Sequence, residues 1–179
     1  MSEPKTEKKL PPFVFERERG VYAIDVTRDV AHAIIELGTE DALQADALRV
    51  LRLLADASIP VFCVKMHRTA VTLALAGTDL ERATATLQIA NLRAKTRRDL
   101  CLVAVRAASM RDLYGVMSDI ADALSAAKAN IYALSDSHNS VQCLIEAERL
   151  PQALNSLRKT FRLAESVIEE SSIETEGMA

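Results

Sequence analysis

The chain has 179 residues, of which 49% are hydrophobic, and a formal net charge of −3. This length allows one sizeable core or two small ones. Lys and Arg are scattered among acidic residues, which argues against a nucleic-acid-binding surface. No apolar run reaches the roughly 18 residues of a membrane-spanning helix, and the amino-terminal residues lack a signal-peptide pattern, so no membrane association is expected.

The three cysteines point to a reducing compartment. Cys63, Cys101 and Cys143 are widely spaced, odd in number and placed inside apolar segments. Such cysteines are typical of buried thiols rather than of a disulfide framework. We therefore expect a cytoplasmic protein.

The first elements in chain order are a lead-in and a strand. Residues 1–12 are charged and end in two prolines, which predicts disorder. The run VYAIDV, within residues 13–28, reads as a leading strand that precedes the first folded unit. Periodicity alone leaves open which sheet this strand completes.

A folded unit follows. Its predicted elements are an apolar strand at 31–37, a helix from Leu43, two extended runs at 61–66 and 69–76, a helix near Asp79 and a short closing strand at 92–96. In the second extended run, Val71, Leu73 and Leu75 share one face. This order of elements predicts a small α+β unit.

The second half repeats this pattern at a constant offset and without a gap. The helical stripe from Leu43 recurs from Leu113, and the extended run from Val71 recurs from Val141. Two helices on one face of an antiparallel sheet form the split βαβ arrangement of ferredoxin-like folds. We therefore predict an α+β protein of two ferredoxin-like βαββαβ units, whose exposed sheet edges favour dimerisation.

The predicted boundaries follow from this repeat. They are 1–12 for the disordered lead-in, 13–28 for the leading strand, 29–98 for the first unit, 99–164 for the second unit and 165–179 for an acidic flexible tail.

Several short motifs of the second repeat resemble the second ACT domain of bacterial aspartokinases. The matching positions are Met110, Gly115-Val116, Asn130-Ile131, Ser135, Ser137 and the run from Leu157 to Phe161. Residues 20–162 as a whole resemble the regulatory region of that family, in which the leading strand completes the second domain's sheet. The sequence has no phosphate-cradling Gly-rich loop and only 5 glycines, so we expect a regulatory part and not a kinase enzyme.

The resemblance implies a non-catalytic regulatory protein that binds a free amino acid, Lys or Thr by family analogy, and forms a homodimer. Two alternatives stay open: a ligand-free assembly module, and the regulatory subunit of a separate aspartate kinase catalytic chain. The first repeat reads Ala42-Leu43-Gln44-Ala45 where the family has Asp-x-Pro-Gly, and Tyr114 replaces the Pro in the second repeat. These departures favour the assembly module. No cofactor is expected.

By this resemblance, six residues of the second repeat are candidate ligand-binding residues: Asp112, Tyr114, Gly115, Val116, Asn130 and Ile131. The α-carboxylate of an amino acid suits the N–H groups of a helix that begins at Gly115 and Val116. Asp112 would face the ammonium group, and Asn130 would donate or accept a hydrogen bond. Simpler interpretations also stand, with Asp112 as a helix N-cap, Gly115 as a turn residue and Asn130 as a strand-edge residue.

Other polar groups are weaker candidates. Thr39, Glu40 and Asp41 read as a capping cluster, while a ligand of the first repeat would rest on Ser58 and Pro60.

Metal binding and nucleophilic catalysis are not expected. The pair Cys63 and His67 has no second pair to complete a metal site. The run Asp136-Ser137-His138 reads as a turn rather than a catalytic triad, because a triad is assembled by geometry and not by sequence neighbours.

Overall fold

The structure, a computed structural model, describes residues 20–37, 43–164 and 168–172. The strands are β1 (Val21–Glu36), β2 (Phe62–His67), β3 (Ala70–Ala76), β4 (Arg93–Ala107), β5 (Ala133–Asp136), β6 (Ser140–Glu146) and β7 (Ile168–Ser172). The helices are α1 (Leu43–Asp56), α2 (Leu80–Ile89), α3 (Val116–Ala126) and α4 (Leu150–Phe161). Within these ranges, none of the helices combines the length and the apolar character needed to cross a membrane.

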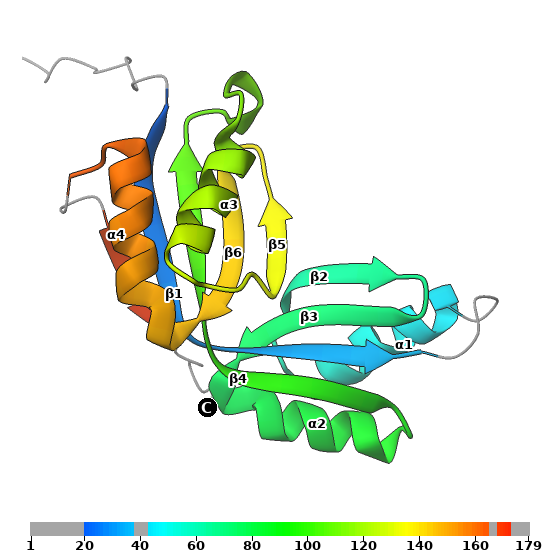
Figure 1. Ribbon diagram of the computed structural model, residues 1–179. Helices are drawn as coiled ribbons and strands as arrows, with labels where there is room; N and C mark the ends of the chain where they lie inside the picture. Colours follow the sequence, from blue (N-terminus) through cyan, green and yellow to red (C-terminus); the bar gives the residue numbers. More distant parts are fainter. Residues whose placement is uncertain (1–19, 38–42, 165–167, 173–179) are drawn as a thin grey trace, which may run out of the picture.

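Two strands run through both halves of the molecule. β1 has 16 residues and β4 has 15, and they pair with each other along most of their length. The sheet order is β2-β3-β1-β4-β6-β5. β7 also pairs with β1, along residues 24–28, whereas β3 pairs with residues 30–36 of β1. Figure 1 shows that the sheet turns sharply between the halves, where β1 and β4 bend. The closing strand expected at 92–96 and the repeat equivalent of the apolar strand expected at 31–37 are therefore one continuous strand, β4.

Both bends occur at an aspartate with a left-handed backbone. Asp29 has a φ of 57° and Asp99 a φ of 56°, and the β1–β4 register shifts between Thr27 and Val30. Aspartate tolerates this backbone region better than most residues. Asp29 and Asp99 are separated by the same offset as Leu43 and Leu113, so the two bends are equivalent positions of the repeat.

The leading strand completes the second sheet, as predicted. The first part of β1 pairs antiparallel with the last part of β4, where Ile24 lies opposite Val105 and Val26 opposite Val103. The fold class is confirmed: two ferredoxin-like units with antiparallel strands. The residue ranges assigned to the two units stay a prediction, because β1 and β4 belong to both.

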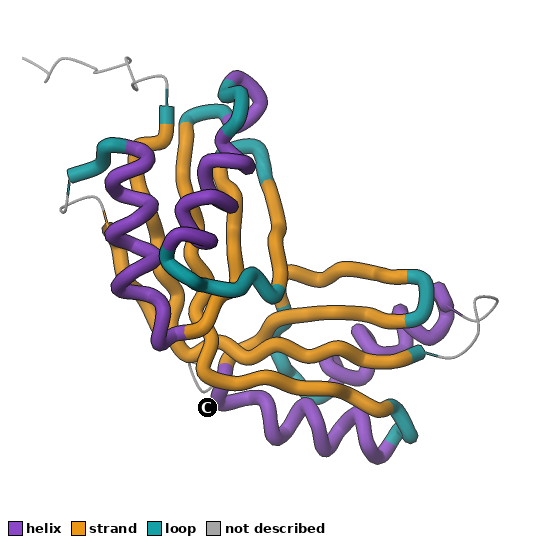
Figure 2. Tube along the Cα trace, viewed as in Figure 1, coloured by secondary structure: helices purple, strands orange, loops and turns teal. Residues whose placement is uncertain are grey.

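Each half has its helices on one face of the sheet (Figures 1 and 2). One core lies under α1 and α2 and includes Leu73 and Leu87, and another lies under α3 and α4 and includes Ile120 and Leu157. The predicted faces of β3 are confirmed, since Val71, Leu73 and Leu75 all join the core of the first half. A third, smaller cluster lies between the halves on the opposite face and consists of Val30, Ala74, Leu100, Leu102 and Leu144.

Two predicted elements differ from the structure. The helix expected from Leu113 begins at Val116, because Leu113 is extended and Gly115 has a φ of 80°. Residues 168–172, expected to lie in a flexible tail, instead form β7, which pairs in parallel with residues 24–28 of β1. Ile168 packs against the core of the second half, and Arg28 forms an ion pair of 2.9 Å with Glu170, which explains the order of this acidic segment. The lead-in at 1–12 lies outside the described residues.

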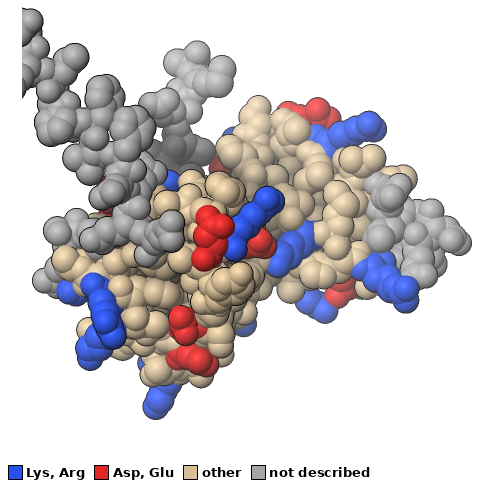
Figure 3. All heavy atoms as spheres, turned by 90° about the horizontal axis from the view of Figure 1, so that it is seen from above, with Lys and Arg blue, Asp and Glu red and all other residues tan. Residues whose placement is uncertain are grey.

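Charged side chains are interspersed on the face shown in Figure 3, with acidic and basic groups side by side. The ion pairs of the described residues include Glu36 with Lys95, Glu81 with Arg98 at 3.0 Å, and Asp25 with Arg106 at 2.8 Å.

Candidate functional site

The amino-terminal end of α3 presents unpaired backbone donors. Gly115 occupies the N-cap position, and no side chain accepts a hydrogen bond from the first turn. Asp112 lies in a short turn, η3 (Met110–Asp112), and is exposed. The interpretation of Asp112 as the N-cap is therefore wrong. Among the residues that the structure describes, no side chain caps the first turn of α3, so its N–H groups can receive an anionic group.

Gly115 is required for its backbone conformation. Its φ of 80° is rarely adopted by residues with a side chain, whereas a Cβ at this position would meet no atom within 4 Å. This is the turn role that the simpler interpretation gave it. Gly115 itself is exposed.

The other residues at this end differ in exposure. The Tyr114 side chain is 97% exposed, and Met117 on the first turn of α3 is 43% exposed. Val116 is buried and packs in the core of the second half, so only its backbone can take part in binding.

A cavity of about 350 Å³ lies next to η3. Its lining includes Met110, Arg111, Met117, Asp136 and His138. The N–H of Met110 donates to the His138 carbonyl at 2.8 Å, which holds η3 against the loop between β5 and β6. Sequence reasoning did not find this cavity, because its walls come from two loops that approach each other only in the folded chain.

The loop between β5 and β6 is a turn, as predicted. The Ser140 N–H donates to the Ser137 hydroxyl oxygen at 3.1 Å, and the Ser137 N–H donates to the Ser140 carbonyl at 2.8 Å. These bonds occupy the Ser137 hydroxyl and give it the role of a turn residue.

Asn130 is held by a carboxylate. Its backbone N–H donates to Glu146 Oε2 at 3.0 Å, its Nδ2 donates to Glu146 Oε1 at 2.6 Å, and the Tyr132 hydroxyl donates to the same Oε1 at 2.7 Å. Burial raises the pKa of Glu146, but the hydrogen bonds from Asn130 and Tyr132 outweigh burial and lower the pKa to about 2. The Asn130 amide therefore points its NH₂ group at Glu146, which leaves its carbonyl oxygen as the group that can meet a ligand.

The six candidate residues form two groups rather than one site. Asp112, Tyr114, Gly115 and Val116 lie at or before the first turn of α3, whereas Asn130 and Ile131 follow its last turn. α3 has 11 residues, so its axis is about 16 Å long at 1.5 Å per residue. A single amino acid cannot span that distance, and one chain does not bring the two groups together.

In the first half, Thr39, Glu40 and Asp41 lie outside the described residues. Pro60 lines a cavity of about 320 Å³ between the two halves, together with Phe62, Asp79, Leu102 and Gln142.

Asp79 is an acidic group that the sequence reasoning did not single out as a functional residue. It is 5% exposed, and its Oδ1 accepts a hydrogen bond from Arg82 Nη2 at 2.7 Å. Arg82 also donates to the Ser58 carbonyl at 3.2 Å. In the part of the chain that is described, Asp79 Oδ2 has no hydrogen-bond partner.

The thiols differ in burial. Cys101 and Cys143 are buried as predicted, and burial raises the pKa of each to about 11. Cys63 is only half-buried, and its thiol donates to Gln142 Oε1 at 3.6 Å. Across the described ranges, no three His, Cys, Asp or Glu side chains gather in a way that would hold a metal ion.

Comparisons with known proteins agree with the fold. Residues 95–159 match the family model of the ACT domain. The sequence has no match among curated proteins.

Solved structures resemble the chain over most of its length. The regulatory subunit of aspartate kinase from Thermus flavus has a TM-score of 0.71 at 18% identity, over 80% of this chain and 99% of that one. A structure of aspartokinase alpha and beta subunits has a TM-score of 0.73 at 24% identity, over 80% of this chain and 100% of that one. E. coli aspartokinase III in complex with lysine and aspartate has a TM-score of 0.65 at 19% identity, over 80% of this chain and 33% of that one.

These likenesses concern the fold. The structures that are matched along nearly their whole length include the regulatory subunit of an aspartate kinase. Residues 95–159 thus match the ACT domain family, and the described chain as a whole has the fold of a regulatory subunit of aspartate kinase.

Proposed function

We propose that this protein is a non-catalytic, cytoplasmic regulator that binds a free amino acid, with Lys as the first candidate and Thr as the second. The observation that carries the proposal is the uncapped, open start of α3 within the ACT-matching residues. An α-carboxylate would accept hydrogen bonds from the first-turn N–H groups, where the helix dipole also favours negative charge.

The neighbouring acids would bind the ammonium groups. Asp112 is exposed just before the start of α3, and Asp136 lines the cavity next to η3. A ligand with two ammonium groups, such as Lys, would use both carboxylates. The similarity to an aspartokinase that was solved with lysine supports Lys as the first ligand to test.

A second copy of the chain would complete the site. The start of α3 in one chain would face Asn130 and Ile131 of the other, because the two groups cannot meet within one chain. Tyr114 at 97% exposure and Ile131 at 37% exposure would be covered by this contact. Among the described strands, β2 and β5 are the two ends of the strand order, and edge strands suit side-by-side pairing of sheets. Ligand binding at such an interface would couple to the dimer arrangement, typically by about 1–3 kcal/mol.

Thermal unfolding against each of the twenty amino acids tests the proposal. Binding at 100 times Kd stabilises the folded state by about 2.7 kcal/mol, which raises the Tm by roughly 5–11 °C for a chain of this size. The increase should disappear in Asp112→Ala. It should persist in Asp122→Ala, a matched control that removes an exposed acid from the middle of α3.

The outcome decides between the amino-acid sensor and the assembly module. If none of the twenty amino acids changes the Tm, while light scattering shows a stable dimer, the protein is a ligand-free assembly module. Tyr114 in place of the family Pro favours that alternative. If the increase survives Asp112→Ala, the ligand binds elsewhere and the start of α3 is not the site.

The regulatory subunit of a separate kinase is the remaining candidate. The chain covers 99% of a regulatory subunit that was solved on its own, which favours this role. Co-purification of a catalytic kinase chain with the tagged protein would support it, and a stable dimer that retains no such chain would count against it.

A further inference from the structure

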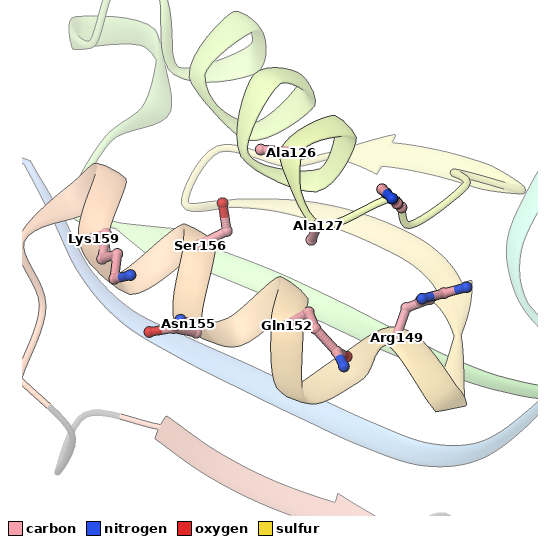
Figure 4. Close-up of a pocket in the computed structure, with 8 residues that line it drawn as sticks. Ala126, Ala127, Arg149, Gln152, Asn155, Ser156 and Lys159 are labelled. Carbon is pink, nitrogen blue, oxygen red and sulfur yellow. The ribbon is translucent and has the colours of Figure 1, made fainter.

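A basic groove runs along α4 on the helical face of the second half. It has a volume of about 400 Å³ and lies between the end of α3 and α4 (Figure 4). Its charged lining residues are Lys128, Arg149 and Lys159, and no Asp or Glu of the described chain lines it. This local excess of positive charge contrasts with the net charge of −3 of the whole chain.

The rest of the groove wall is polar. Gln152, Asn155 and Ser156 of α4 line it, and Ser156 points toward the end of α3 (Figure 4). The amides and the hydroxyl are hydrogen-bond donors that can bind an anion alongside the cations.

The cations of the groove are weakly compensated. Arg149 Nε lies 3.6 Å from Oε1 of the adjacent Glu148, whose side chain is 75% exposed. Among the residues that the structure describes, Lys128 and Lys159 have no ion-pair partner. These three positive charges are therefore only partly neutralised by acidic side chains and are available to a bound anion.

The positions in the first half that are equivalent to this groove carry different side chains. Asp79 and Arg82 are the repeat equivalents of Arg149 and Gln152. In the first half, Arg82 bridges the Asp79 carboxylate at 2.7 Å and the Ser58 carbonyl at 3.2 Å. In the second half, Arg149 stands at the position of Asp79 and Gln152 at the position of Arg82, so this bridge cannot form there.

Arg149 also opposes its own helix. It occupies the N-cap position of α4, and the first turn of α4 contains no acidic residue. A helix N-terminus favours negative charge, and Asp79 provides it at the N-cap of α2. A cation at the start of α4 is unfavourable in isolation, and an anion bound beside it would reverse that effect. A charge that opposes local stability, such as a cation at a helix N-terminus, is expected mainly at functional sites.

We propose that the groove of the second half binds a polyanion that carries a chain of phosphate groups, independently of the amino-acid site. Arg149 directly precedes α4 and Lys159 lies ten positions further on, about 15 Å along the helix axis at 1.5 Å per residue. A single phosphate group would not reach both cations, whereas a chain of phosphate groups could extend along the groove toward both. The triphosphate is either free or part of a nucleotide, and this chemistry is common to both sources.

Isothermal titration of the full chain with tripolyphosphate, and separately with ATP, tests the proposal. The double variant Arg149→Gln/Lys159→Gln should bind at least about tenfold more weakly at an ionic strength of about 0.15 M, since exposed charges are then screened beyond about 8 Å and only contacting charges matter. The matched control Lys65→Gln/Arg93→Gln removes two exposed cations from the first half and should leave binding unchanged.

A graft from the first half gives a sharper test. Arg149→Asp/Gln152→Arg recreates the pair formed by Asp79 and Arg82, and it should abolish tripolyphosphate binding without lowering the Tm. Binding of ATP as tight as that of tripolyphosphate supports a site for the phosphate chain, and tighter binding of ATP supports a nucleotide site.

Three results would overturn the proposal. They are no binding by the unmodified protein, equal weakening in the groove and control variants, and tighter binding of a hexaglutamate peptide than of tripolyphosphate. The last result would assign the groove to an acidic protein segment. The amino-acid-induced rise in Tm does not depend on this groove, so loss of one activity leaves the other testable.

Discussion

The two halves should unfold as one cooperative unit, because β1 and β4 run uninterrupted through both. Leu87 in the first core is 2% exposed, and Leu157, its equivalent in the second repeat, is 0% exposed. Each can be replaced by Ala. The lost side-chain carbons contribute about 2.4 kcal/mol at 0.8 kcal/mol per group, and the cavity raises the cost to about 3 kcal/mol or more. For a chain of this size, 3 kcal/mol lowers the Tm by roughly 6–12 °C.

Differential scanning calorimetry measures this effect directly. Leu87→Ala and Leu157→Ala should each shift one single transition, by similar amounts, although the two residues lie in different cores. The calorimetric and van't Hoff enthalpies should agree, as they do for a two-state unit. Two separate transitions, of which each variant moves only one, would refute the reasoning that the shared strands join the halves.

Other predictions concern titration and thiol chemistry. The pKa of Glu146 is about 2 in the folded state against 4.5 as the ordinary value, so its stabilisation is present above pH 4.5 and is lost as the pH falls toward 2. Urea midpoints of Glu146→Gln should depend less on pH in that window, and an unchanged pH profile would contradict this. Burial lowers the pKa of His32 below 6.5, so stability should fall as the pH drops through 6.5, and His32→Gln should flatten that slope in the same assay. Maleimide labelling at pH 8, followed by mass spectrometry, should modify Cys63 before Cys101 and Cys143, whose pKa of about 11 and burial protect them; faster labelling of either buried thiol would argue against the packing of the second core.

The repeat made most of the fold predictable. Apolar positions at a constant offset predicted equivalent helices and strands, and the structure starts α2 at Leu80 and α4 at Leu150, which are equivalent positions of the repeat. The continuity of β1 and β4 was not predictable from pattern. The polar residues at Asp29 and Asp99 interrupt the apolar runs and read as breaks, although the strands pass through them with a left-handed residue at each bend.

β7 could not be inferred for a different physical reason. Its sequence, IEESS, has an acidic composition that is typical of solvated tails. Its pairing depends on contacts that are remote in sequence, namely the packing of Ile168 and the ion pair between Arg28 and Glu170. Local propensity contains no information about such partners.

The candidate site was predictable only in part. The resemblance placed the start of a helix at Gly115 and Val116, where α3 begins, whereas the apolar spacing alone started it too early, at Leu113. The sequence contained no signal that Glu146 holds Asn130, since the two residues meet only when β6 lies beside the start of β5. Asp79 was predicted to lie at a helix start, and it is the N-cap of α2; its burial, by contrast, depends on tertiary packing and has no signal in the sequence.

A chain of contacts links one candidate ligand group to the other half of the molecule. Glu146 accepts hydrogen bonds from both Asn130 and Tyr132, and the guanidinium carbon of Arg97 lies 4.4 Å from the centre of the Tyr132 ring. Arg97 belongs to the part of β4 that pairs with the first-half segment of β1, where it lies opposite His32. Three side chains and one shared strand thus form a continuous path of contacts from Asn130 to the first half. Spatial continuity alone does not establish energetic coupling. In this molecule the shared strand makes the physical case stronger, because β1 and β4 both continue from one half into the other and pair along most of their length.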